Sequence, residues 1–159
     1  MNEKGLTLIE VLVTVSILAI LASIALPMAE LTFKRQKEVE LKRNLRMIRT
    51  AIDGYKKAWD EGKIEKKVGD SGYPPDLEVL VEGIKDIKDI KGEKVMKFLR
   101  RIPKDPMYDD PYGDTDPEDT WGLRSYDSPY NDPSEGEDVF DVYSTSDDEA
   151  INGTKYRDW

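Results

Sequence analysis

Apolar side chains are concentrated near the start of the chain. Residues 6–26 hold one charged residue, Glu10, and their Leu, Ile, Val and Ala are spread around all sides of a helix. At about 1.5 Å per residue, such a helix is roughly 31 Å long, which is enough to cross the hydrocarbon core of a bilayer. A helix that is apolar all round is not an ordinary surface helix. The pattern predicts a membrane-spanning helix.

Apolar residues then return in alternating steps of four and three, at Leu41, Leu45, Ile48, Ile52, Tyr55 and Trp59. This spacing predicts an amphipathic helix with a single apolar stripe. The stripe lasts under three heptads, which favours packing on a domain over a two-stranded coiled coil. Pro27 removes one helical hydrogen bond, so we expect one long helix over residues 6 to about 60 that is interrupted near Pro27.

The rest of the chain predicts short elements. Asp76 is a plausible N-cap for a short helix over 77–81, and residues 95–99 resemble one more helical turn. The Ile-Lys-Asp repeats in 84–94 read as a loop or solvated face. The best strand candidates are 120–126 and 138–144. We therefore expect an α+β fold, in which a long N-terminal helix, half membrane and half amphipathic, packs on a small antiparallel sheet.

Composition narrows the chemistry. The chain has 159 residues, a net charge of −9, no His and no Cys. Imidazole bases, thiol nucleophiles, disulfides and thiolate metal sites are thereby excluded, and the acidic balance argues against a nucleic-acid binder. Metal binding is limited to oxygen ligands, chiefly for Ca²⁺ or Mg²⁺. No pair of carboxylates is spaced to suggest a glycosidase, and we expect no enzyme.

Glu10 is the informative residue of the apolar segment. An ionised carboxylate inside a membrane helix costs roughly 2.5–3.5 kcal/mol at the centre and less near the end, so such a residue calls for a function and a partner. Residues 5–10 read Gly-Leu-Thr-Leu-Ile-Glu, and an apolar run and Pro27 follow. This arrangement resembles the signal of type IV pilins and type II secretion pseudopilins.

The resemblance implies processing and assembly residues. A prepilin peptidase would cleave between Gly5 and Leu6 and methylate Leu6, and Glu10 would be the fifth residue of the mature chain. In a filament, the Glu10 carboxylate would then meet the terminal ammonium of a neighbouring subunit and so specify the register. The alternative from composition is a removed signal peptide, with Ser23-Ile24-Ala25 as its cleavage site.

Further islands resemble the protein G-type major pseudopilin in the family's order: Tyr73-Pro74-Pro75, residues 100–106, residues 140–144 and Asp158-Trp159. The absence of Cys also favours a pseudopilin over a type IVa pilin, whose terminal loop usually has a disulfide. The expected parts are a leader (1–5), a transmembrane and filament-core helix (6–26), an amphipathic helix (27–60) and a globular head (61–159).

The function implied is a structural subunit of the bacterial inner membrane, single-pass, with its C-terminal domain in the periplasm. It would polymerise into a periplasmic pseudopilus for type II secretion. Its partners would be further copies of itself, the prepilin peptidase, an inner-membrane assembly platform, minor pseudopilins and the lipid bilayer. Two alternatives are a type IV-like pilin that forms a surface fibre, and a membrane-anchored binding domain that never polymerises.

The resemblance also implies a Ca²⁺ site in the last loop, with Asp147 and Asp148 on its first half. On its second half, the family's acids are replaced by Thr154 and Lys155. We therefore expect the ammonium of Lys155 to take the place of the metal, so that no cofactor is required.

Charge is segregated along the chain. Residues 34–57 hold nine bases and three acids, whereas residues 105–159 hold seventeen acids and three bases. In a polymer, we expect the basic helix and the acidic lobe to meet between subunits, with a strength that salt screens.

Overall fold

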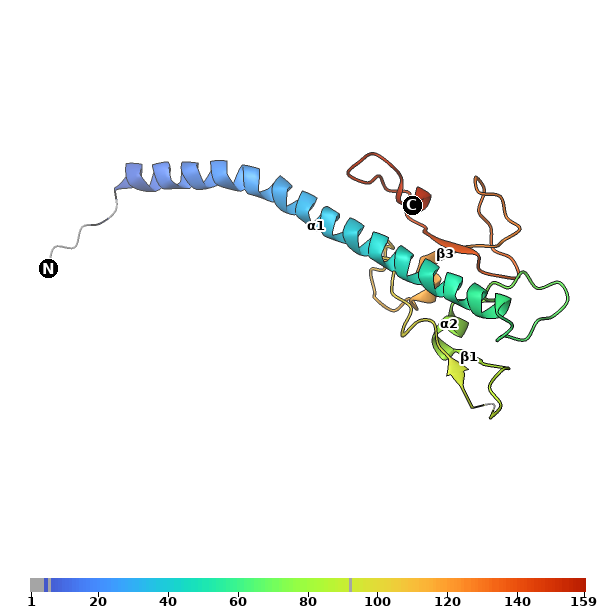
Figure 1. The fold of residues 1–159 in the computed structure, drawn as a ribbon. Coiled ribbons are helices and arrows are strands. Elements are labelled where there is room, and N and C mark those ends of the chain that lie inside the picture. Colours follow the sequence, from blue (N-terminus) through green and yellow to red (C-terminus); the bar gives the residue numbers. More distant parts are fainter. Residues whose placement is uncertain (1–4, 6, 92) are drawn as a thin grey trace. The chain divides into compact units, whose positions relative to one another are not determined.

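The structure is a computed structural model that describes residues 5, 7–91 and 93–159 (Figure 1). Its contacts divide the chain into two units, residues 1–36 (unit 1) and residues 37–159 (unit 2). The elements are the helices α1 (Leu8–Asp60) and α2 (Glu78–Glu82), the 3-10 turns η1 (Glu118–Thr120) and η2 (Tyr156–Asp158), and the strands β1 (Ile84–Lys85), β2 (Val95–Met96), β3 (Trp121–Arg124) and β4 (Asp141–Ser144). The arrangement is α+β and pilin-like, as predicted.

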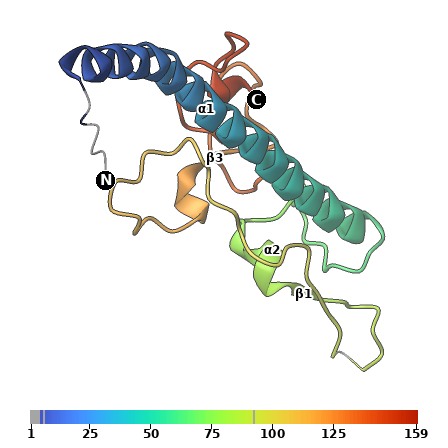
Figure 2. The same cartoon turned by 90° about the vertical axis from the view of Figure 1, so that its left-hand side faces the viewer.

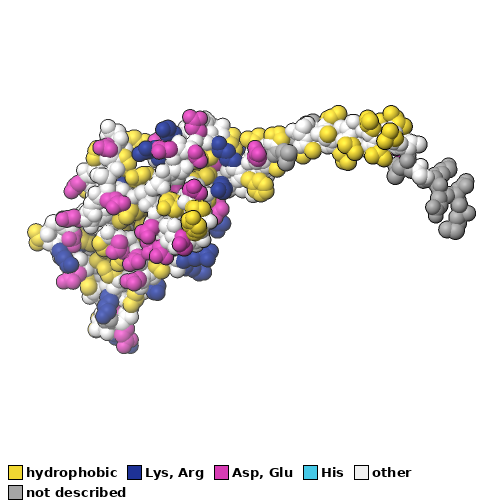
Figure 3. All heavy atoms as spheres, turned by 180° about the vertical axis from the view of Figure 1, so that it is seen from behind, with side chains coloured by type: hydrophobic (Ala, Val, Ile, Leu, Met, Phe, Trp, Pro, Cys, Tyr) yellow, Lys and Arg dark blue, Asp and Glu magenta, His cyan; other side chains and the backbone are white. Residues whose placement is uncertain are grey.

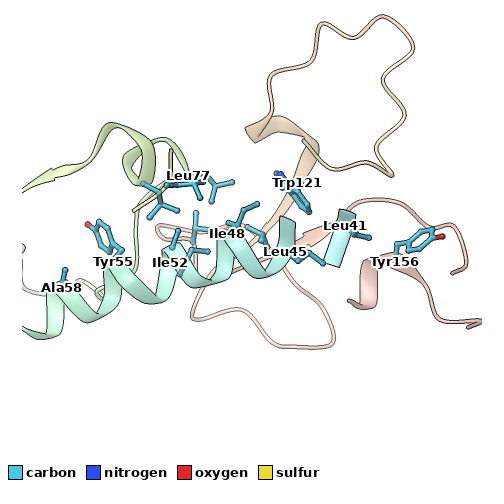
Figure 4. Packing of buried hydrophobic residues seen from close by; sticks show 14 of the residues in the cluster. Leu41, Leu45, Ile48, Ile52, Tyr55, Ala58, Leu77, Trp121 and Tyr156 are labelled. Carbon is cyan, nitrogen blue, oxygen red and sulfur yellow. The ribbon is translucent and has the colours of Figure 1, made fainter. Parts of the chain in front are cut away.

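The apolar stripe of α1 forms the centre of unit 2. Leu41, Leu45, Ile48 and Ile52 are almost completely buried, and Tyr55 is 6% exposed. Figure 4 shows these side chains on one side of the helix, facing Leu77 of the short-helix region and Trp121 of β3. The spacing of four and three therefore predicted the buried face correctly.

The sheet that packs on this stripe consists of β3 and β4, which are antiparallel with Trp121 opposite Ser144 and Leu123 opposite Val142. Both strands fall inside the ranges predicted from the sequence. Trp121 and Val142 are buried in the core, and the indole Nε1 of Trp121 donates a hydrogen bond to the carbonyl of Pro103 over 2.7 Å. The indole thus buries its ring and still satisfies its polar atom.

A second antiparallel pair was not predicted. Ile84 pairs with Met96 and Lys85 with Val95, so 84–85 is not loop and 95–96 is not a helical turn (Figure 2). Two backbone amides, from Phe98 and Leu99, donate to the carbonyl of Leu80 at 2.9 Å, which holds the chain after β2 against α2 instead of in a helix.

Gly83 makes this pairing possible. Its φ is +86°, and a Cβ at this position would lie 2.6 Å from the carbonyl oxygen of Met96. The chain therefore turns out of α2 with a conformation and a close approach that only glycine permits without strain.

Two helix boundaries also differ from the predictions. Pro27 lies inside α1, and the helix is assigned without interruption from Leu8 to Asp60. A single missing amide costs one hydrogen bond, and neighbouring turns retain theirs. The helix α2 begins at Glu78 rather than at 77, with Asp76 Oδ1 accepting a hydrogen bond from the Val79 amide over 2.8 Å, so Asp76 does stabilise its first turn.

Candidate processing and assembly site

Among its described residues, unit 1 presents an apolar helical surface that is exposed. It contains a window long and apolar enough to span a membrane by length and composition, with a mean hydropathy of 2.5 and none of it buried. Figure 3 shows apolar side chains along this unit, whereas acidic and basic side chains are scattered over unit 2. The exposed side chains include Leu8 at 86% and Phe33 at 67%.

Hydroxyl groups in this segment are satisfied locally. The hydroxyls of Thr14, Ser16 and Ser23 each donate to a backbone carbonyl three or four residues earlier, over 2.7–2.9 Å. Such bonds allow polar side chains to lie in an apolar environment. Within the described part of residues 6–26, Glu10 therefore remains as the one charged side chain, and its contacts decide what it can do.

Glu10 lies in the first turn of α1 and is bonded to Thr7. The Glu10 amide donates to Thr7 Oγ1 over 3.3 Å, and the Thr7 amide approaches a Glu10 carboxylate oxygen at 3.5 Å. This is the reciprocal arrangement of a capping box, which satisfies two amides that the helix start leaves unpaired. Sequence reasoning missed this role, although the signal Thr-x-x-Glu was present.

The remaining processing residues can be placed only in part. Gly5 is exposed, as cleavage beside it requires, and Leu6 lies outside the described residues. Pro27 is exposed inside α1. Glu10 is exposed as well, so its carboxylate is open to a neighbouring molecule.

The terminal loop (residues 147–159) is closed by backbone pairing. Glu149 and Lys155 form an antiparallel bridge, and the Ala150 amide donates to the carbonyl of Thr154 over 2.7 Å. The indole of Trp159 donates to Thr154 Oγ1 over 2.7 Å. The loop is thus shaped by hydrogen bonds between its own two halves.

The expected calcium residues are not gathered into a metal site. Asp147 and Asp148 are exposed, and the described residues contain no group of three or more acidic side chains placed to hold an ion. The cation beside Asp147 is Arg157, whose Nη1 lies 3.0 Å from Asp147 Oδ1. Lys155 is exposed and makes no ion pair within the described chain, so its expected role stays a prediction.

Two polar side chains of α1 hold the terminal loop, and neither was predicted. Glu38 accepts hydrogen bonds from the Ile151 amide over 2.7 Å and from the Tyr156 hydroxyl over 3.1 Å. Burial of the phenol and the adjacent Glu38 carboxylate raise the pKa of Tyr156 to about 12. The hydroxyl therefore remains a donor across the physiological range.

Arg49 is the second of these side chains. It donates to Asp141 Oδ1 over 2.7 Å, to the Val142 carbonyl over 3.0 Å and to the backbone oxygen of Trp159 over 2.7 Å. Between Glu38 and Arg49, the ammonium of Lys42 lies 4.1 Å from the centre of the Trp159 ring. Positions 38, 42 and 49 share one helix face because they are four and seven residues apart, a spacing that was visible in the sequence.

Comparisons with known proteins support the interpretation of the N-terminal segment as a prepilin-type signal. Residues 1–26 match the model for the prokaryotic N-terminal methylation motif. Searches of curated proteins and of solved structures gave no significant match. The motif and the apolar helix that it opens fit a membrane-anchored, type IV pilin-like structural subunit that a prepilin peptidase processes.

Proposed function

We propose that this chain is the major subunit of a periplasmic pseudopilus for type II protein secretion. It is stored in the bacterial inner membrane, with unit 2 in the periplasm, and leaves the membrane by polymerising. The observation that carries this proposal is the uncovered apolar helix that follows directly on the methylation motif.

The physical reason is that the same surface suits two environments. Lipid tails cover the apolar side chains while the subunit is stored, and the helices of neighbouring subunits cover them in a filament. Transfer from one to the other keeps the side chains out of water. An exposed apolar surface of this kind has no place on a soluble monomer.

The choice of a pseudopilus over a surface fibre is supported by the protein G-like islands and by the lack of Cys. Unit 2 supports it further, because its terminal loop is closed by hydrogen bonds and by the anchors Glu38 and Arg49, with no need for a disulfide.

Mass spectrometry of the intact protein from its native membrane tests the processing step. We expect a mass lower by residues 1–5 and higher by one methyl group. A mature chain that begins at Leu26 would establish the signal-peptide alternative and end the proposal.

Deletion of the gene then separates the remaining alternatives, with restoration of the gene as control. We expect loss of protein secretion and no loss of fibres from the cell surface. Loss of surface fibres with normal secretion would identify a surface pilin. A processed protein that never cross-links to a second copy would identify an anchored binding domain.

A further inference from the structure

Unit 2 carries an apolar groove on the outward side of α1. Val39 and Met47 of the helix and Phe98 after β2 form apolar walls, and Lys42, Arg43 and Arg46 line the same groove. Its volume is about 610 Å³. Val39 is 63% exposed and Met47 is 37% exposed, and no acidic residue contributes to the lining in the described part of the chain.

The bases of this groove are largely unengaged. Arg43 and Arg46 are exposed and take part in none of the ion pairs found among the described residues. Lys42 differs from them in that its ammonium lies over the Trp159 ring, 4.1 Å from the ring centre. The groove therefore combines apolar walls with basic side chains, and it should bind an apolar group that is flanked by acidic residues.

The same chain displays such a group on the loop 105–117, which precedes η1. Tyr112 is 89% exposed, and Asp109, Asp114 and Asp116 around it are exposed as well. In Figure 4, the loop that leads into Trp121 extends away from the core.

Hydrogen bonds hold the turn around Tyr112 in a defined conformation. Asp110 Oδ1 accepts the Gly113 amide over 2.8 Å, and Asp110 Oδ2 pairs with Lys104 Nζ over 2.8 Å. Gly113 has a φ of +72°, which this tight turn requires. A fixed turn loses little conformational entropy when its tip is bound.

We propose that Tyr112 of one subunit inserts into the groove of a second copy, with Asp109, Asp114 and Asp116 facing Arg43 and Arg46. This inference rests on the proposed polymerisation. The loop contributes no residue to the lining of its own groove, so the contact forms between copies. The Tyr112 turn and the groove are different surfaces, so the interface is heterologous. Repeating it adds subunits into a filament, unless the rotation between successive subunits closes a ring.

Other exposed apolar residues fit the groove less well. Val68 and Ile90 are fully exposed, but Lys66 and Lys67 precede Val68, and Ile90 lies between Lys88 and Lys91. The basic side chains of the groove would repel these lysines. Tyr130 is 79% exposed, and the Arg124 guanidinium lies 5.9 Å from its ring centre. Tyr112 combines exposure with three exposed acidic neighbours, Asp109, Asp114 and Asp116, while the nearby Lys104 is already paired with Asp110.

The absence of native Cys allows a clean cross-linking test. Full-length Met47→Cys and Tyr112→Cys, each with a different epitope tag, are co-expressed in cells that assemble the filament and are then oxidised. We expect a disulfide-linked dimer that carries both tags. The matched control pairs Met47→Cys with Tyr130→Cys, a second exposed tyrosine on another acidic loop. Circular dichroism verifies that every variant folds.

The dimer should be several-fold more abundant for Tyr112→Cys than for Tyr130→Cys, and absent when either cysteine is omitted. Electron microscopy of the unsubstituted chain reports filament formation separately. If filaments form and the two pairs cross-link equally or not at all, the groove contact is overturned and polymerisation stands. If the unsubstituted chain forms no filament with its assembly machinery, the proposed function fails and this inference fails with it.

Discussion

Arg49 on α1 donates from Nε to the Asp141 carboxylate of β4 over 2.7 Å, so the basic helix and the acidic lobe meet inside a single subunit. The sequence led us to expect such contacts between subunits. Arg49 is neutralised by an ion pair within its own subunit, whereas the side chains of Arg43 and Arg46 are exposed to solvent. The charge segregation thus contributes to the fold of unit 2, and a role in assembly stays a prediction.

Replacing Arg49 by Ala should destabilise unit 2 and release the terminal loop. The guanidinium makes three hydrogen bonds, and bonds to charged groups contribute about 1.5–3 kcal/mol each before exposure reduces them. We expect a loss of about 2 kcal/mol in the free energy of unfolding of residues 37–159, measured by urea denaturation.

Arg46→Ala is the matched control for Arg49→Ala, because Arg46 is on the same helix and makes no ion pair in the described structure. It should change stability by no more than about 0.5 kcal/mol. Equal losses from the two variants would show that the hydrogen bonds of Arg49 do not set the effect.

The sequence predicted what depends on periodicity and missed what depends on contacts between distant segments. The stripe from Leu41 to Tyr55 and the strands β3 and β4 follow from local patterns. The pair β1 and β2 contains four residues, and its position is fixed by the carbonyl of Leu80 and by Gly83. No window of sequence around residue 95 contains that information.

The candidate site likewise has one part that local sequence patterns predicted and another part that depends on distant contacts. The methylation motif is local, so it could be read from residues 1–26 and the family model agrees. Glu38 and Arg49 bind partners that lie 92–118 residues away, and the helix face that they share does not identify those partners. Arg157 and Lys155 are two residues apart, and only the backbone geometry of the loop decides which of them meets Asp147.

Asp105 should make unit 2 less stable as the pH rises. The residue is 3% exposed. Burial raises the pKa of its carboxyl above 3.8, and hydrogen bonds from the Ser144 hydroxyl and the Met107 amide partly offset this rise. A raised pKa means that the folded state binds the proton more tightly. The stabilisation is complete below the ordinary pKa and is lost as the pH rises through the raised value.

Asp105→Asn tests this, because the amide retains an acceptor for Met107 and gains a donor for Ser144. At pH 7 we expect the variant to be at least as stable as the native chain, by up to about 1 kcal/mol, with the difference shrinking at pH 4. Thermal unfolding of residues 37–159 at both values measures it. A constant difference between the two proteins at both values would contradict the assignment.

The two roles of Glu10 can be separated by one substitution. A capping box accepts Gln as well as Glu, so Glu10→Gln keeps the helix start and removes the charge. We expect normal membrane insertion and cleavage, with filament yield strongly reduced, by immunoblotting of sheared filaments. Thr7→Ala, which removes the cap and keeps the charge, should assemble far better. The opposite ranking would assign Glu10 to helix capping and remove the ion pair with a neighbour's terminus.

The terminal loop should need no calcium, and Arg157 rather than Lys155 should supply its cation. The sequence predicts that the Lys155 ammonium takes the place of the metal, whereas in the structure it is Arg157 that contacts Asp147. That pair is exposed, so its removal should cost no more than about 1 kcal/mol.

We therefore compare Lys155→Ala and Arg157→Ala in residues 37–159, each in EGTA and in millimolar Ca²⁺. Both the native fragment and the variants should melt at the same temperature in the two buffers, and Arg157→Ala should melt lower than Lys155→Ala. A melting temperature of the native fragment that rises steeply with Ca²⁺ would instead show that Asp147 and Asp148 belong to a working metal site.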